Sequence, residues 1–199
     1  MGRRPGESYR DGVDLRETLR ALPTFPEELP VLDPAAVPGD PNDLFLIWLT
    51  EAIASGERQA NAMTLTTVGE GGVPASRTLI VKDIDGRGLH FSSSRSSRKG
   101  IHLAQRPVAT MLFFGRPLGR QVEVTGDVVA LDAAASQADW RECPSYDGTD
   151  NPDWQVWAVQ PTRYEFLQAT HDRKHTRVEF KRGAEDWTRS HADPTLGWR

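Results

Sequence analysis

Apolar residues recur at helical spacing in one early segment of the chain, and after residue 61 they alternate with polar residues instead. The helical pattern spans residues 42–55, where Asn42 or Asp43 is the expected cap and Gly56 ends the helix. Its apolar face consists of Leu44, Phe45, Trp48, Leu49, Ala52 and Ile53. We therefore predict one amphipathic helix followed by a β-rich region.

Period-two alternation and turn residues divide the rest of the chain into short strands. Glycine-containing turns at 69–72, 85–88 and 115–119 join consecutive strands. The predicted strands are Ala62–Val68, Pro74–Asp83, Leu89–Ser93, Val108–Phe114, Arg120–Ala130, Arg163–Ala169 and Thr176–Lys181. The short helices expected among them are Arg98–Ala104, after Ser97, and Asp132 to about Trp140. This pattern predicts a mainly β, antiparallel fold with flanking helices (α+β) and favours a closed barrel.

Proline dominates the first 41 residues, which hold seven of the fourteen prolines. A short helix is expected over Asp14–Leu22, and the prolines that follow it prevent regular structure. We predict an N-terminal Pro-rich arm over residues 1–40 and one domain over residues 41–199. Two interpretations of the arm stay open: it wraps the domain or a partner subunit, or it is a disordered tail.

Composition limits the function classes. The 199 residues suffice for one compact domain, and the formal net charge of −4 argues against nucleic acid as the main partner. The single cysteine, Cys143, excludes an intramolecular disulfide, indicates a reducing compartment and has no activating neighbours. No apolar run approaches the roughly 20 residues that span a bilayer, and residues 1–6 do not begin a signal peptide. We therefore expect a cytoplasmic protein with no membrane partner.

Two segments combine cations with hydroxyl groups. Arg77 and Lys82 are five residues apart, so they lie on opposite faces of a strand unless a bulge or the strand end brings them together. In the second segment, serines lead into a helix whose first turn carries Arg98 and Lys99. Cations there oppose the helix dipole, and a bound phosphate at the helix N-terminus would explain them. The alternative for both segments is a solvated charged surface.

A third segment places Arg173, His175 and Arg177 at period two, so a strand would project all three to one face. Such a face binds anions and handles protons, and the alternative is a solvated β edge. His171 and His175 lack a third ligand at a convincing spacing, so we expect no metal site. The sequence contains no dinucleotide-binding glycine motif, no Walker-type loop and no nucleophile elbow.

The order and spacing of these motifs resemble the pyridoxamine 5′-phosphate oxidase family over residues 41–194. Arg77–Lys82 resembles its Arg-[Val/Ile]-[Val/Leu]-Leu-[Val/Leu]-Lys strand, and Phe91–Lys99 resembles its Phe-Tyr-Thr-Asn…Ser-Arg-Lys segment. The other matching segments are Asn61–Met63, Pro107–Phe113, Arg120–Gly126, Glu165–Gln168 and Arg173–Arg177.

The resemblance implies a split β-barrel that forms a homodimer with FMN at the subunit interface. Arg98 and Lys99 would hold the FMN phosphate, and Gln121 would lie beside the isoalloxazine ring. Arg173 and His175 would be catalytic and face the substrate. Lys82 and Arg141 are further substrate-binding candidates. The implied flavin-binding set is Arg77, Thr78, Leu79, Ile80, Val81, Lys82, Ser92, Ser93, Arg98, Lys99, Gln121, Leu167 and Arg177.

The implied activity is an FMN-dependent oxidation of pyridoxamine or pyridoxine 5′-phosphate to pyridoxal 5′-phosphate, a step of pyridoxal phosphate biosynthesis. The flavin accepts a hydride from the substrate, and dioxygen reoxidises it to give hydrogen peroxide. The implied partners are a small phosphorylated substrate, dioxygen and a second copy of the chain.

The sequence departs from the family pattern at three points. The Tyr-x-x-x-Arg-x-x-x-Ser substrate-phosphate motif is absent near residues 139–147, where Arg141 or Ser145 is the available substitute. The stretch that follows is short and lacks the usual Gln-Ser flavin contact, and the Trp beside the flavin is Leu167. Three hypotheses therefore stay open: the oxidase above, a flavin oxidoreductase with another substrate, and a barrel that binds FMN or pyridoxal phosphate without turnover. A deazaflavin in place of FMN also stays open.

Overall fold

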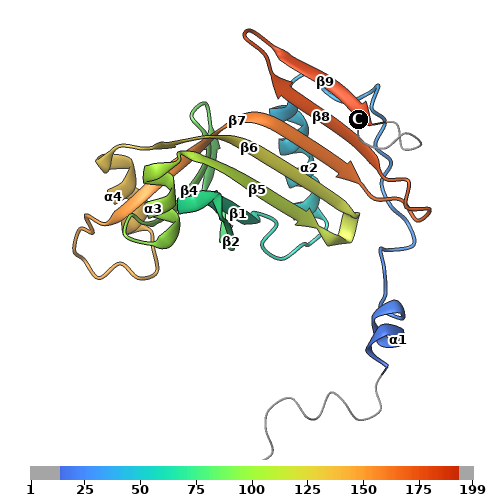
Figure 1. Ribbon diagram of the computed structural model, residues 1–199, viewed down its shortest axis with the longest axis horizontal. Helices are drawn as coiled ribbons and strands as arrows, with labels where there is room; N and C mark the ends of the chain where they lie inside the picture. The colour runs from blue at the N-terminus through green and yellow to red at the C-terminus, as the bar shows by residue number, and fades with distance from the viewer. Residues whose placement is uncertain (1–13, 193–199) are drawn as a thin grey trace, which may run out of the picture.

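The computed structural model describes residues 14–192 as one antiparallel sheet with helices beside it, the first of which stands apart from the sheet (Figure 1). The α-helices are α1 (Leu15–Arg20), α2 (Pro41–Ala54), α3 (Arg98–Gln105) and α4 (Ala133–Arg141). The strands are β1 (Ala62–Val68), β2 (Pro74–Ile80), β3 (Asp83–Asp85), β4 (Gly88–Ser94), β5 (Val108–Gly115), β6 (Arg120–Ala130), β7 (Trp154–Gln168), β8 (Thr176–Arg182) and β9 (Trp187–Ala192). Among residues 14–192, no helix is both long and apolar enough to cross a bilayer.

The strands pair in the order β2-β1-β5-β6-β7-β4-β3, and the β8–β9 hairpin extends from β7. Alternation along β1 and β6 gives the sheet two distinct faces. The inner face carries the buried side chains of Leu65, Met111 and Val124, which are register partners across β1, β5 and β6. The outer face is more exposed. Within the described residues β2 and β3 do not pair, so the sheet is open: the split barrel is confirmed, and the closed barrel expected from strand spacing is wrong.

Strand β7 organises the sheet because it pairs with β6 along one edge and with β4 and then β8 along the other. Its ladder with β6 shifts register next to Gly126, where a Cβ atom would lie 2.0 Å from the Gln160 carbonyl oxygen. Only glycine permits this approach, and Pro161 lies opposite it, at a bulge that tolerates a missing N–H. The bend lets one strand serve both halves of the split sheet.

Helix α2 covers the inner face and completes the core. Trp48 packs edge-on against Phe166, with ring centroids 5.3 Å apart, and Phe45 packs against Phe113 at 5.0 Å. Burying each such ring stabilises the fold by roughly 1.5–3 kcal/mol. Asp40 caps the helix by accepting the Asn42 N–H at 2.8 Å, so the cap expected at Asn42 or Asp43 lies two or three residues too late.

The later part of the proline-rich segment before α2 lies against the domain, whereas α1 stands away from it and is exposed (Figure 1). Leu32 is buried in the core, and the Val37 carbonyl accepts a hydrogen bond of 3.2 Å from Arg189. The short helix expected near its start is present as α1, with Asp14 as its cap. Residues 1–13 of the expected arm lie outside the described residues. The division into an arm and a domain at residue 40 stays a prediction.

Most predicted elements are confirmed within a few residues, and the exceptions have physical reasons. Strand β7 begins nine residues before the predicted Arg163, because Gln155–Val159 is buried on both faces and lacks alternation. The strand predicted over Pro74–Asp83 stops at Ile80, and β3 begins a new pairing with β4. Strand β9 was not predicted, because its sequence is polar and exposed.

Candidate functional site

Arg77, Arg98 and Lys99 form a cluster of three cations, the cation cluster, where β2 and β4 approach the start of α3. Arg77 reaches from β2 across β1 and donates through Nη1 to Leu65 O at 3.1 Å and to Thr67 Oγ1 at 2.8 Å. Lys99 Nζ donates to Ser93 Oγ on β4 at 2.7 Å. These bonds hold the two side chains with neutral oxygen acceptors, so they leave the positive charges uncompensated.

The cation cluster lacks a counter-ion in the part of the chain that the structure describes. None of the three forms an ion pair with a described carboxylate. Arg77 Nη2 is buried without a hydrogen-bond partner. Burial, and then repulsion by Arg98, lowers the pKa of Arg77, and burial, and then repulsion by Arg77, lowers the pKa of Lys99. A buried donor without an acceptor costs about 1–3 kcal/mol, so this arrangement favours an anionic ligand.

Local sequence explains why α3 begins at this cluster. Ser97 is its N-cap and accepts the Gly100 N–H at 3.3 Å. A Cβ atom at residue 100 would lie 2.2 Å from the Arg95 carbonyl oxygen, so glycine lets the helix start pack against the preceding loop. The first N–H groups of a helix have no intrahelical acceptor and carry partial positive charge. An anion at this position would interact with the helix start and with the cation cluster together.

Two residues that the sequence analysis did not single out orient Arg77. Thr67 Oγ1 accepts from Arg77 and lies 3.1 Å from His102 Nδ1. Thr67 is buried, and its hydroxyl group therefore links Arg77 of β2 to His102 of α3. His102 follows Lys99 by one helical turn, and this spacing was the available signal in the sequence.

The structure separates several residues that the resemblance groups together. Lys82 lies after the end of β2 and pairs with Asp139 of α4, with 3.2 Å between Nζ and Oδ1. Ser92 and Ser93 are neighbours on β4 and point to opposite faces, and only Ser93 contacts Lys99. In the segment Thr78–Val81, Thr78 and Ile80 are exposed, whereas Leu79 packs against the core and Val81 is buried in it.

A second group of expected flavin residues lies in one row on the outer face. Gln121 of β6 is the register partner of Leu167 on β7, which is in turn the partner of Arg177 on β8. Arg77 lies on the inner face, opposite Leu65. Three strand spacings and three residues along β6 separate the backbone of Arg77 from that of Gln121 by roughly 17–18 Å. Within one chain, these two groups therefore lie on opposite faces of the sheet.

No strand runs through Arg173 and His175, so the shared face that a strand would give them with Arg177 is absent. Strand β8 begins at Thr176, and Arg173 lies in the preceding turn with φ of 63°. The turn still orders His175, because its Nδ1 accepts the Thr170 N–H at 3.1 Å. In the neutral ring this bond leaves the proton on Nε2. Arg141 is exposed near the end of α4 and pairs with Asp150 at 3.2 Å.

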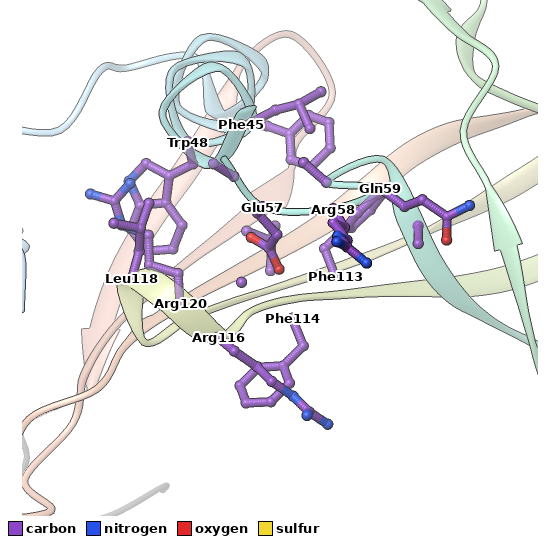
Figure 2. Close-up of a pocket in the computed structure, with 16 residues that line it drawn as sticks. Phe45, Trp48, Glu57, Arg58, Gln59, Phe113, Phe114, Arg116, Leu118 and Arg120 are labelled. Carbon is purple, nitrogen blue, oxygen red and sulfur yellow. The ribbon is translucent and has the colours of Figure 1, made fainter. Parts of the chain in front are cut away.

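A cavity of about 230 Å³ lies between α2 and the β5–β6 hairpin, and sequence reasoning did not anticipate it. Figure 2 shows the Glu57 carboxylate pointing into it between Trp48 and Phe113. Glu57 Oε2 is buried without a hydrogen-bond partner, and burial raises the pKa of this carboxyl. The residues that line the cavity do not include the cation cluster.

Comparison with known proteins gives consistent results. Residues 49–168 match the family model described as pyridoxamine 5′-phosphate oxidase, and residues 154–194 match the model described as pyridoxine 5′-phosphate oxidase C-terminal dimerisation region. A pyridoxine/pyridoxamine 5′-phosphate oxidase from Thermosynechococcus vestitus is 33% identical over 183 residues, covering 75% of this chain and 87% of the relative. One from Thermobifida fusca is 31% identical over 209 residues, covering 87% and 91%.

Two solved structures share the fold. PhzG from Burkholderia lata, in complex with tetrahydrophenazine-1-carboxylic acid, superposes with a TM-score of 0.76 at 24% identity and covers 83% of this chain and 99% of its own. A pyridoxamine 5′-phosphate oxidase-related, FMN-binding protein from Nostoc punctiforme superposes with a TM-score of 0.66 at 18% identity, covering 78% and 98%. The sequence matches and the open antiparallel sheet agree, and the chain belongs to the pyridoxamine 5′-phosphate oxidase family.

Proposed function

We propose that this protein is an FMN-dependent oxidoreductase in which the cation cluster binds the FMN phosphate. The observation that supports this most strongly is the set of three uncompensated cations with a buried, unpartnered Arg77 Nη2. A phosphate dianion provides several acceptor oxygens and matches the planar guanidinium donors. The residues present therefore fit the phosphate end of FMN.

We infer a homodimer with FMN between the two copies. Gln121, Leu167 and Arg177 lie in one row on the outer face, opposite to the face that carries Arg77 of their own chain. A second copy would bring that row to the flavin ring while the first copy holds the phosphate. Phe114, the register neighbour of Gln121 on β5, is 48% exposed and would be covered by such a contact.

Bound FMN would supply hydride acceptance from the substrate and reoxidation by dioxygen. The chain itself would orient the ring through the Gln121 amide and stabilise negative charge through Arg177. Arg173, exposed in the turn before β8, would bind the anionic substrate. His175 would present its Nε2–H toward the reacting carbon substituent, since Thr170 occupies Nδ1.

We propose pyridoxamine or pyridoxine 5′-phosphate as the substrate and pyridoxal 5′-phosphate as the product. Arg173 and His175 are retained from the family pattern and support this choice. One specific observation favours a second candidate, a flavin oxidoreductase with a different substrate. The family's substrate-phosphate motif is missing near residues 139–147, and Arg141 is already paired with Asp150.

The test is to identify the cofactor of the purified protein by mass spectrometry. Hydrogen peroxide release is then measured with pyridoxamine 5′-phosphate and with pyridoxine 5′-phosphate. FMN together with peroxide from pyridoxamine 5′-phosphate supports the first candidate. Bound FMN without peroxide release from either phosphate supports the second candidate, or a protein that carries FMN without turnover. A deazaflavin, or no flavin after reconstitution with FMN, would refute the proposed cofactor.

A further inference from the structure

The β3–β4 hairpin brings two aspartates and a histidine together on one side, away from the cation cluster. Asp83 is the register partner of His90, and Asp85 lies two residues further along β3 on the same face. Ligand atoms of the three side chains lie within 4.8 Å of one another. The turn therefore assembles two oxygens and one ring nitrogen from eight consecutive residues.

His90 is the unusual member of this group because it is only 3% exposed. It lies next to Ala158 of β7, which is fully buried. Its Nε2 lies 3.0 Å from Asp85 Oδ1 and its Nδ1 lies 3.8 Å from Asp83 Oδ2, so one carboxylate lies beside each ring nitrogen. Nevertheless Nε2 is buried and makes no hydrogen bond. Buried polar atoms that make no hydrogen bond are rare, and a ring nitrogen that lies beside a carboxylate without an aligned hydrogen bond to it is compatible with an ion bound between the two groups.

The distances between the ligand atoms of these side chains suit a divalent transition metal ion. Such ions bind imidazole nitrogen and carboxylate oxygen at about 2.0–2.2 Å, which places two ligands of one ion roughly 3–4 Å apart. The 3.0 Å between His90 Nε2 and Asp85 Oδ1 falls in that range, and Asp83 offers a further oxygen among ligand atoms that all lie within 4.8 Å of one another. An ion needs one ring nitrogen and one oxygen from each aspartate, and water can complete its coordination.

Hydrogen bonds from neighbouring groups fix the orientation of both carboxylates. Arg87 donates to Asp85 Oδ2 from Nε at 2.8 Å and from Nη2 at 2.6 Å, and Asp85 Oδ1 accepts the Arg87 backbone N–H at 2.7 Å and lies beside His90. Asp83 Oδ1 accepts the Ile84 N–H at 2.8 Å, which leaves Oδ2 toward the ring. The Asp83 side chain is 64% exposed, so an ion can enter from solvent.

We propose that Asp83, Asp85 and His90 form a binding site for a divalent transition metal ion, with Zn²⁺ as the preferred ion. A mixed imidazole and carboxylate set suits Zn²⁺ better than Mg²⁺, which takes oxygen ligands. The ion would fix the β3–β4 hairpin, which begins directly after Lys82, and would stabilise this end of the sheet. This proposal is independent of the proposed flavin chemistry.

The test is calorimetric titration of the chelator-treated full-length protein with Zn²⁺ alone and with Mg²⁺ alone. We expect one Zn²⁺ per chain, an increase in melting temperature with Zn²⁺, and no saturable binding of Mg²⁺. Asp83→Asn should weaken Zn²⁺ binding at least tenfold, and since Asp83 is exposed this variant should fold. His90→Gln should abolish binding.

Two exposed residues elsewhere provide matched controls, Asp186→Asn and His191→Gln, which should bind Zn²⁺ within twofold of the unmodified chain. The proposal is overturned if the chain binds no Zn²⁺, or if Asp83→Asn binds it as tightly as the controls do. If His90→Gln does not fold, the Asp83→Asn comparison still decides the question.

Discussion

Two arginines of this protein differ in the charge of their neighbours: one is surrounded by carboxylates and the other by cations. Arg163 on the outer face donates to Glu123 and Glu179 at 2.5 Å and to Glu165 at 2.7 Å, so its charge is compensated within the chain. Arg77 on the inner face has neutral acceptors and two cationic neighbours whose charges no described carboxylate balances. The first arrangement is typical of a structural network. The second is typical of a binding site, where the counter-ion arrives with the ligand.

Removing the two cations at the start of α3 should have the largest effect. Arg98→Ala combined with Lys99→Ala should weaken FMN binding by about 3–6 kcal/mol, because two charge-assisted bonds of roughly 1.5–3 kcal/mol each are lost. Flavin absorbance of the purified protein and a fluorescence titration measure this. Arg106→Ala, at the end of the same helix, is the control and should retain FMN. Undiminished flavin content in the double variant would refute the placement of the phosphate.

Removing the compensated arginine should instead reduce stability. Arg163→Met leaves three carboxylates adjacent and should lower the free energy of unfolding by about 1–3 kcal/mol, a value discounted for partial solvent screening. Urea denaturation of the flavin-free protein measures it. Arg98→Ala is the matched variant and should not destabilise the flavin-free protein, because it relieves repulsion. Equal destabilisation by the two substitutions would contradict the claim that the charge of Arg163 is compensated within the chain and that of the cation cluster is not.

Arg173 tests the separation of substrate binding from flavin binding. Arg173→Ala should lower kcat/KM with pyridoxamine 5′-phosphate roughly tenfold or more, about 1.4 kcal/mol or above, while FMN stays bound. The exposed position of Arg173 makes a folding defect unexpected. Peroxide release and flavin absorbance on the same sample measure both quantities. Loss of flavin would contradict the role assigned to this turn.

The smallest expected effect is a pH dependence of stability in the flavin-free protein. The pKa of Lys99 is lowered in the folded state, so between that value and 10.5 the unfolded chain binds more protons than the folded chain. Stability therefore rises with pH in this window, relative to Lys99→Met, which lacks the group. Melting temperatures of both proteins between pH 8 and 10 measure the difference. A falling difference would contradict uncompensated positive charge at the cation cluster.

The sequence predicted elements best where one face of a strand is buried and the other is exposed. Strands β1 and β6 alternate cleanly and were predicted at their observed bounds. The first half of β7 is covered on both faces, so the alternation that identifies a strand is absent there. The bend at Gly126 depends on the carbonyl of Gln160, a contact between residues 34 positions apart that local patterns do not show.

In the candidate site, too, local sequence patterns identified some residues, whereas others join the site only through the folded structure. Ser97, Arg98 and Lys99 are consecutive, and a local rule about helix starts was enough to identify them. Thr67 and His102 join the cluster only through the approach of α3 to β1, so no spacing along the chain indicated both together. Alternation suggested a shared face for Arg173 and His175 if a strand ran through them, but the chain turns there before β8 begins.

The central claim is that Arg77, Arg98 and Lys99 recognise a phosphate group, and comparing FMN with riboflavin tests it most directly. The two ligands share the ring and differ in the phosphate. We predict that the unmodified protein binds FMN at least a hundredfold more tightly than riboflavin, and that this ratio falls close to one in the Arg98→Ala, Lys99→Ala variant. Equal affinity for both ligands in the unmodified protein, or an unchanged ratio in the variant, would contradict the account.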